Sequence, residues 1–408
     1  MRLWCWPVVG GMHTKKNLKF FYIMSKQITN DLVKHFEKLK LKPSSLHEPT
    51  FKGNELKYLT KCIKTGYVSS VGSFVNKIEN KIKKVTKSKY AIAVINGTYA
   101  LELALRSLNI KKNEEILSPS LTFVATANAI THSGGVPHFV DVNEKNFGVC
   151  PDKLEIYLNK ISYKRGNKLI NKKTKNIIKA LVAVHLFGFA CEIDKLKKIC
   201  TKFNIVLLED AAESIGTFYK KKHLGNFGKL GIISFNGNKT ITCGNGGVII
   251  TSDKSLAKKI KHLSTTAKKK HKYEYIHDQI AFNMRLSNVN AAIGCAQLEK
   301  LNQIIKIKRS NFQKYKKSFK KFKYLTIIEE PKNTTGNYWL ICLRLNRYYK
   351  IKNNLLSRLN KKNINCRAIW KPLHKLNIYK KIQSDNLTST NLLYDSVINL
   401  PSSPSLKI

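Results

Sequence analysis

The chain has 408 residues, of which 43% are hydrophobic and 10% aromatic, a composition typical of a folded globular protein and not of a disordered one. Its 74 lysine and arginine residues against 25 acidic residues give a formal net charge of +49, which favours anionic ligands. The basic residues are spread along the whole chain, without zinc-finger spacing, an RNA-binding string or a repeat. We therefore expect no nucleic-acid partner, and a basic nucleic-acid-binding protein stays as the alternative from a different class.

Cysteine usage and hydropathy favour a cytoplasmic protein. The nine cysteines include no C-x-x-C pair and no metal-ligand spacing with histidine, so we expect neither a metal site nor an oxidising compartment. No apolar run reaches the roughly 18 residues of a membrane-spanning helix. Residues 1–24 place an apolar stretch before a basic one, the reverse of a signal peptide, and we interpret them as an extension upstream of a start near Met24.

From about residue 50, helical and strand-like segments alternate along the chain. Apolar residues at three- and four-residue spacing predict helices over Asn54–Lys64 and Ser73–Lys87, and a third helix opens at Thr98 after a strand and a turn. Short apolar runs predict strands at Tyr90–Ile95, Glu115–Leu117, Val136–Val140, Ile178–Val184 and Ile205–Leu208, with a helix over Ile193–Phe203. The polar stretch 161–176 is expected to be a surface loop. This alternation predicts an α/β fold with a mainly parallel central sheet and helices on both faces.

The pattern changes past Leu286. Two helices are expected, over about residues 288–300 and onward to about Phe322. A strand, a helix and a second strand follow, at Tyr338–Leu345, Lys350–Lys361 and Asn365–Trp370. We therefore divide the chain into the extension 1–24, a large α/β domain over 25–285 and a smaller C-terminal α/β domain over 286–408. No G-x-G-x-x-G or G-K-[ST] loop indicates dinucleotide or P-loop chemistry.

One lysine stands out in the segment GIISFNGNKTITCGNGGVII, residues 231–250. Two apolar runs, predicted as strands, flank a glycine-rich turn that carries Lys239 near the hydroxyl of Ser234. A lysine amine that loses its proton can form a Schiff base with an aldehyde. In a chain so rich in lysine, a solvated surface charge is the simpler interpretation.

Three other segments supply complementary chemistry. The segment NGTYAL (96–101) opens a helix, where backbone N–H groups and the Thr98 hydroxyl can hold an anion, although ordinary capping explains it too. EDAAES (209–214) places Asp210 at a strand end, where its carboxylate can hold a proton on a pyridine nitrogen or merely pair with a helix dipole. In SLTFVAT (120–126), Phe123 can stack on a flat ring or pack in the core. Together these are the parts of a pyridoxal 5'-phosphate site.

From about Glu48 to Leu406 the chain resembles the DegT-type sugar aminotransferases, which are pyridoxal-phosphate enzymes of fold type I acting on nucleotide-linked keto sugars. The resemblance is carried by TGYVSSVGSFV (65–75), NGTYALELAL (96–105), SPSLTFVATANAI (118–130), LLEDAAESIG (207–216), FGKLGIISFNGNK (227–239) and FNMRLSNVNAAIGCAQLEKL (282–301). SFNGNK and STTAKKKHKYEYIHD (264–278) look most like the aminotransferases of legionaminic-acid and related nonulosonate pathways.

The resemblance implies a role for each matching position. Lys239 would be the Schiff-base lysine, Asp210 the partner of the pyridine nitrogen, and Glu213 a neighbour of the ring hydroxyl. Phe123 would stack on the ring, while Thr98, Tyr99 and Ser234 would bind the phosphate. Asn283 would reach the phosphate from a second subunit, which implies a homodimer with shared active sites. The segments near the substrate contain His185, Arg285 and His374.

The implied reaction moves an amino group from glutamate to the 4-keto group of a nucleotide-linked 4-keto-6-deoxy sugar. A sugar dehydratase or a non-catalytic relative on the same fold is the alternative. Dehydratases of this type carry a histidine at the position of Lys239, which argues against the first of these.

Overall fold

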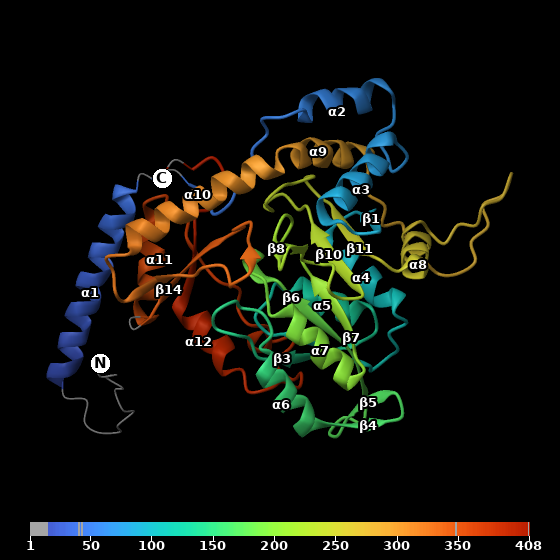
Figure 1. The fold of residues 1–408 in the computed structure, drawn as a ribbon. Helices are drawn as coiled ribbons and strands as arrows, with labels where there is room; N and C mark the ends of the chain where they lie inside the picture. Colours follow the sequence, from blue (N-terminus) through green and yellow to red (C-terminus); the bar gives the residue numbers. More distant parts are fainter. Residues whose placement is uncertain (1–14, 40, 42–43, 347–348, 407) are drawn as a thin grey trace.

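The computed structural model describes residues 15–39, 41, 44–346, 349–406 and 408. The first fourteen residues of the expected extension therefore lie outside the described part. Helix α1 (Lys15–Lys38) runs through the expected boundary at residue 24 and lies against α11 (Lys352–Lys361) (Figure 1). Leu32 and Phe36 of α1 are buried in one core with Leu355 and Leu359. The segment after residue 24 thus packs with the C-terminal part of the chain.

A mixed sheet forms the centre of the larger part of the molecule. Its main strands follow the order β1-β11-β10-β7-β6-β2-β3. Neighbours from β10 to β3 are parallel, and β11 runs antiparallel to both β1 and β10. The bounds are Tyr90–Val94 (β1), Glu115–Pro119 (β2), Val136–Val140 (β3), Ile177–Val184 (β6), Val206–Asp210 (β7), Leu230–Ser234 (β10) and Gly247–Thr251 (β11). The expected α/β fold with a mainly parallel sheet is confirmed.

Helices cover both faces of this sheet because successive strand residues point to opposite sides. Ile116 and Val182 pack with α4, α5 and α8, whereas the next residue on β2, Leu117, packs with α6 and α7. Near β1 and β11 that second face is covered by α3 and α9, with α2 outside them (Figure 1). The bounds are Glu55–Lys64 (α2), Ser73–Thr86 (α3), Gly97–Ser107 (α4), Ala125–His132 (α5), Pro151–Ile161 (α6), Ile193–Phe203 (α7), Lys254–Ser264 (α8) and Asn288–Glu299 (α9).

The prediction of a surface loop over residues 161–176 is wrong. Strands β4 (Ser162–Arg165) and β5 (Lys168–Asn171) form a hairpin there, and β5 pairs antiparallel with β6. Gly166 turns the chain with φ +56°, a conformation that glycine adopts readily. Leu169 and Ile170 are buried, but the lysines around them hide the strand pattern in the sequence.

A four-stranded antiparallel sheet organises the smaller part, in the order β12-β14-β16-β15. Its strands and helices have the bounds Leu325–Ile327 (β12), Ile341–Leu345 (β14), Arg367–Ala368 (β15), Val397–Leu400 (β16), Leu301–Phe319 (α10) and Thr388–Ser396 (α12). Helix α9, just past the expected domain boundary at residue 285, packs on α2 and α3, while α10 continues over the smaller sheet (Figure 1). Three short strands join the two parts: Phe218–Tyr219 (β8), Lys222–His223 (β9) and Thr334–Thr335 (β13).

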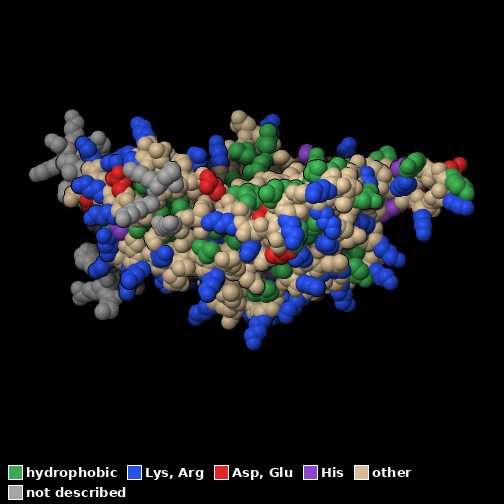
Figure 2. Space-filling view, turned by 90° about the horizontal axis from the view of Figure 1, so that it is seen from above, with side chains coloured by type: hydrophobic (Ala, Val, Ile, Leu, Met, Phe, Trp, Pro, Cys, Tyr) green, Lys and Arg blue, Asp and Glu red, His purple; other side chains and the backbone are tan. Residues whose placement is uncertain are grey.

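The surface has two clear features. Lysine and arginine side chains are scattered over the face in Figure 2 instead of gathering in one patch. A loop after α8, around residues 267–281, projects far from the body and carries the exposed side chains of Tyr273, Tyr275 and Ile280 (Figures 1 and 2). Across the described ranges, every helix is too short or too polar to cross a membrane, and no cluster of three metal-binding side chains occurs.

Candidate active site

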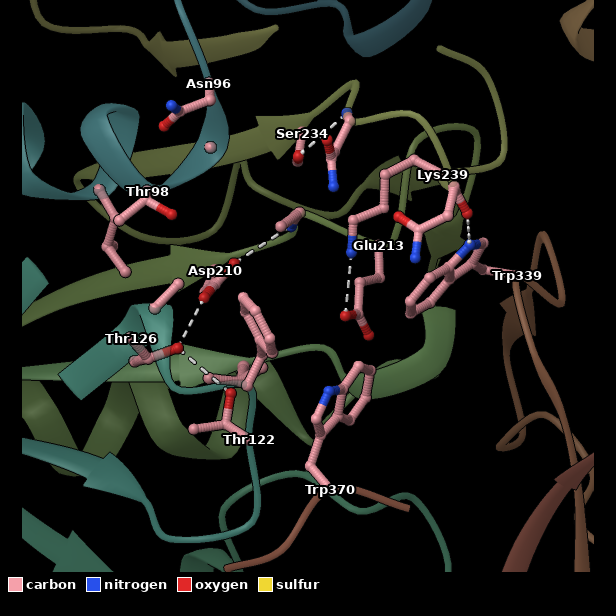
Figure 3. A pocket seen from close by; sticks show the side chains of 18 of the residues that line it. Asn96, Thr98, Thr122, Thr126, Asp210, Glu213, Ser234, Lys239, Trp339 and Trp370 are labelled. Atoms are coloured by element: carbon pink, nitrogen blue, oxygen red, sulfur yellow. Dashed lines mark hydrogen bonds and ion pairs between the residues drawn. The ribbon is translucent and has the colours of Figure 1, made fainter. Parts of the chain in front are cut away.

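A cavity of about 310 Å³ opens where the carboxyl ends of β7 and β10 meet the start of α4 (Figure 3). Ligands bind at this end of the strands in open α/β sheets. The large sheet and its helices supply most of the wall, and Trp339 and Trp370 come from the smaller part of the chain. The expected site residues that line the cavity are Thr98, Phe123, Asp210, Glu213, Ser234 and Lys239.

Lys239 points into this cavity instead of into solvent. Its side chain is 13% exposed, and its Nζ lies 3.2 Å from Oε1 of Glu213. The same Nζ lies 3.9 Å from the centroid of the Trp339 ring. The glycine-rich turn after β10 thus presents one amine to a carboxylate and an aromatic face (Figure 3).

The start of α4 forms an anion site. The Asn96 side chain caps the helix by accepting from the Tyr99 N–H at 2.9 Å, while the N–H groups of Gly97 and Thr98 precede any intrahelical acceptor. Ser234 approaches the helix so closely that a Cβ on Gly97 would lie 2.8 Å from its Cβ. Glycine is therefore required at residue 97. Tyr99 stands on the same turn, but its side chain is not among those that line the cavity.

Asp210 is held by two donors at the end of β7. The Thr126 hydroxyl donates to Oδ2 at 3.0 Å, and the Ala212 N–H donates to Oδ1 at 3.2 Å. The hydroxyl of Thr122 lies 3.2 Å from the hydroxyl of Thr126. Burial raises the pKa of Asp210, although these hydrogen bonds oppose the rise. The sequence analysis missed both threonines, although their spacing of four residues on the segment that carries Phe123 places them together.

Phe123 is not a core residue. The residue is 49% exposed and lines the cavity, and its ring meets Trp370 edge-on at a centroid distance of 6.0 Å. It is therefore free to cover a flat ligand.

Glu213 is fixed by an unusual stretch of backbone. The Phe187 N–H donates to its Oε2 at 2.6 Å, and Phe187 itself has φ 58°, which is uncommon for a bulky residue. Burial raises the pKa of Glu213, while the nearby Lys239 lowers it. The Phe187 ring stacks on Trp370 at 4.7 Å, so the same residue also supports the aromatic wall.

The His185 ring does not face the cavity in this structure. It is fully buried, with Nε2 3.0 Å from Oε2 of Glu209 and Nδ1 3.3 Å from Sγ of Cys191. Burial alone would lower the pKa of His185, but its contacts with Cys191 and Glu209 raise this pKa. The ring therefore forms part of a buried network behind β6 and β7.

The remaining expected residues also lie outside the cavity lining. Arg285 donates from Nε to Oδ1 of Asn283 at 2.9 Å, in a segment that runs beside the end of β1. The Nδ1 atom of His374 lies 2.7 Å from the Ser120 hydroxyl, and burial lowers the pKa of its ring.

The residues present in the cavity fit pyridoxal 5'-phosphate. The start of α4, with the hydroxyls of Thr98 and Ser234, matches a phosphate group, and Asp210 matches a ring nitrogen that carries a proton. Phe123 offers a face for a flat ring, and Lys239 offers the amine for an aldehyde.

Residues 49–408 match the DegT/DnrJ/EryC1/StrS aminotransferase family. The GDP-perosamine synthase of Escherichia coli O157:H7 is 34% identical over 361 residues, which cover 88% of this chain and 93% of that protein. The UDP-4-amino-4,6-dideoxy-N-acetyl-beta-L-altrosamine transaminase of Campylobacter jejuni is 30% identical over 352 residues, covering 85% and 89%.

Solved structures agree with these relatives. A DegT DnrJ EryC1 StrS aminotransferase from Brucella abortus superposes with a TM-score of 0.77 at 25% identity, covering 87% of this chain and 91% of that one. Helicobacter pylori PseC shares the fold with a TM-score of 0.81 at 24% identity, covering 90% and 95%. The chain therefore belongs to the DegT/DnrJ/EryC1/StrS aminotransferase family and is a pyridoxal-phosphate-dependent sugar aminotransferase of fold type I.

Proposed function

We propose that the protein transfers the amino group of glutamate to the 4-keto group of a nucleotide-linked 4-keto-6-deoxy sugar, in a nonulosonate pathway of the legionaminic-acid type. The observation that carries this proposal is the convergence of the Lys239 amine, Asp210 and the start of α4 on one cavity. The relatives support the position of amination, because one is named for a 4-amino-4,6-dideoxy sugar. The high positive charge favours an anionic nucleotide sugar.

Each residue around the cavity then has a defined task. When bound, pyridoxal phosphate supplies an electron sink for the carbanion that forms on the amino donor. Lys239 would take a proton from the α-carbon of the donor as a general base and would deliver it, as a general acid, to the cofactor carbon that carries the amino nitrogen. Asp210 keeps a proton on the ring nitrogen, Phe123 covers the ring, and Thr98 with Ser234 holds the phosphate.

We also propose that two copies of the chain share their active sites. Asn283 does not line the cavity of its own chain, and it follows the projecting loop with the exposed Tyr273, Tyr275 and Ile280. A loop of this shape can reach a second subunit and bring Asn283 to the partner's phosphate site. Arg285 and His374 are proposed to contact the substrate at the rim of the cavity.

Replacing Lys239 tests the proposal. Lys239→Ala should abolish the visible absorbance of the loaded protein and reduce turnover to the background rate, because no amine is left to bind the aldehyde. Borohydride reduction of the wild-type protein should attach the cofactor to Lys239, as read by peptide mass spectrometry. Turnover would be measured as the mass of the product formed from glutamate and a panel of UDP- and GDP-linked 4-keto-6-deoxy sugars.

Lys229→Ala is a suitable control, since Lys229 lies in the same region of the chain but its side chain is 52% exposed and pairs with Asp253. This variant should keep the wild-type absorbance and turnover. Full turnover by Lys239→Ala would exclude the proposed role.

A further inference from the structure

The segment Asn337–Trp339 of the smaller part is inserted between the two segments that carry Glu213 and Lys239. The fully buried Asn337 side chain donates from Nδ2 to the carbonyls of Glu213 at 2.8 Å and Ile215 at 3.0 Å. Its Nδ2 also lies 3.2 Å from the hydroxyl of Thr240, the residue after the lysine. One amide thus ties the acid-bearing turn to the lysine-bearing turn.

Trp339 extends this attachment to the lysine turn itself. Its indole N–H donates to the carbonyl of Asn238 at 2.7 Å, one residue before Lys239. Its own backbone N–H donates to Oδ1 of Asn337 at 2.9 Å, and its carbonyl accepts from the buried Lys308 at 3.1 Å. With only 2% of its surface exposed, the indole cannot turn without breaking these contacts.

An aromatic ring and two carboxyl groups surround the Lys239 amine. The amine lies over the Trp339 ring and beside Glu213, and Asp210 lines the same cavity. A cation over an indole face gains most where water is excluded, as at this buried ring. Two other basic side chains lie behind Trp339, Lys308 at its carbonyl and His47 near its ring, and burial lowers the pKa of each well below its ordinary value.

We propose that Trp339 is a positioning residue for Lys239. The ring of Trp339 stabilises the released amine in its protonated form, and the indole N–H of Trp339 fixes the turn that presents Lys239. The inference rests on the proposed function of Lys239 and adds a reason why the amine, once it has taken the proton from the donor carbon, holds that proton in the cavity until it is delivered. Trp339 acts through Lys239 in this proposal and does not need to touch the substrate.

The test measures the reactivity of Lys239 in the cofactor-free full-length protein. Acetic anhydride modifies only unprotonated amines, and peptide mass spectrometry reports each lysine separately. In Trp339→Leu, labelling of Lys239 near neutral pH should rise about tenfold, because a desolvated cation–π contact of this kind is lost. The midpoint of the labelling profile should move to lower pH, while the plateau at high pH stays at the wild-type level.

Two further variants make the result specific. Trp339→Phe keeps an aromatic face and loses the N–H, so its labelling midpoint should lie between those of the wild type and Trp339→Leu. Tyr338→Leu removes the neighbouring buried ring, which stacks on Phe312 at 4.0 Å away from the lysine, and should leave the profile unchanged.

An unchanged midpoint in Trp339→Leu would overturn the inference, as would a higher plateau with an unchanged midpoint, which reports access alone. Failure of the proposed function is seen separately, as the absence of borohydride trapping at Lys239 in the loaded wild-type protein.

Discussion

Folding favours the neutral form of the Asp210 carboxyl group, whereas the proposed catalysis needs its charged form. Burial raises the pKa of its carboxyl group, so the folded chain binds a proton there more tightly than the unfolded chain does. The stability of the cofactor-free protein therefore falls as the pH rises from the ordinary pKa of aspartate, about 4, through the raised folded value, and stays lower above it. The Asp210 carboxylate is thus in place to pair with the cofactor, but its charge lowers the stability of the cofactor-free protein.

Asp210→Asn should consequently stabilise the cofactor-free protein at neutral pH, by about 1 kcal/mol in the free energy of unfolding. The neutral amide keeps a group that accepts from the Ala212 N–H and faces Thr126, but it carries no charge into the buried site. Thermal unfolding at several pH values would measure the difference, which should shrink as the medium becomes more acidic. A variant that is less stable than the wild type at neutral pH would contradict this account, and turnover of the loaded variant should be strongly reduced.

The elements that a short stretch of sequence specifies by itself were predictable. Strand β3 and helix α7 have the expected bounds, because an apolar run or a helical period is complete within the segment itself. Lys239, Asp210 and Thr98, which line the cavity, could be singled out for the same reason, since each lies in a short motif. Trp339 and Trp370 were not singled out, because they come a hundred residues or more later, in apolar runs that resemble core strands. Only the folded chain brings these rings to the cavity.

A buried polar network joins strands and a helix at the far edge of the large sheet. Oε2 of Glu115 on β2 lies 2.7 Å from Nδ1 of His138 on β3, and the other nitrogen of His138 lies 2.8 Å from the hydroxyl of Tyr157 on α6. Asn171 of the unexpected hairpin donates to the same Glu115 oxygen at 2.8 Å. Although burial opposes ionisation, His138, Thr174 and Asn171 lower the pKa of Glu115.

Breaking this network should lower stability without affecting catalysis. His138→Phe leaves a buried carboxylate without its main partner, so we expect a loss of about 3 kcal/mol in the free energy of unfolding. Activity per folded molecule should be unchanged, because Glu115 stands at the amino end of β2 and the cavity opens at the carboxyl end of the parallel strands. Tyr157→Phe, which removes a single hydroxyl, should lose only about 1 kcal/mol. Equal losses in the two variants, measured by denaturant unfolding, would show that the contact between Glu115 and His138 is not the main contribution.

At the scale of the whole molecule, the projecting loop is the feature that a single chain does not explain. Its exposed side chains, Tyr273, Tyr275 and Ile280, are apolar or aromatic, and the proposed association of two chains through this loop would cover them. Because the same loop leads to Asn283, an association through it would couple oligomerisation to completion of the phosphate site. A symmetric dimer allows this, since each chain then supplies its Asn283 to the partner's site and receives the partner's residue in its own.

Heterodimers can separate a shared site from a site built by one chain. A Lys239→Ala chain can be paired with an Asn283→Asp chain by co-expression with two affinity tags. If the sites are shared, one of the two sites then has both an intact Lys239 and an intact Asn283, and the other site has neither. This heterodimer should retain about half of the wild-type turnover, as expected for a two-fold symmetric enzyme with one working site. A heterodimer of a wild-type chain with a chain that carries both substitutions has, under sharing, one defect in each site and should be inactive. If each chain used its own Asn283, the two results would be exchanged, so the pair of measurements decides between the arrangements even when the absolute activity of each preparation varies.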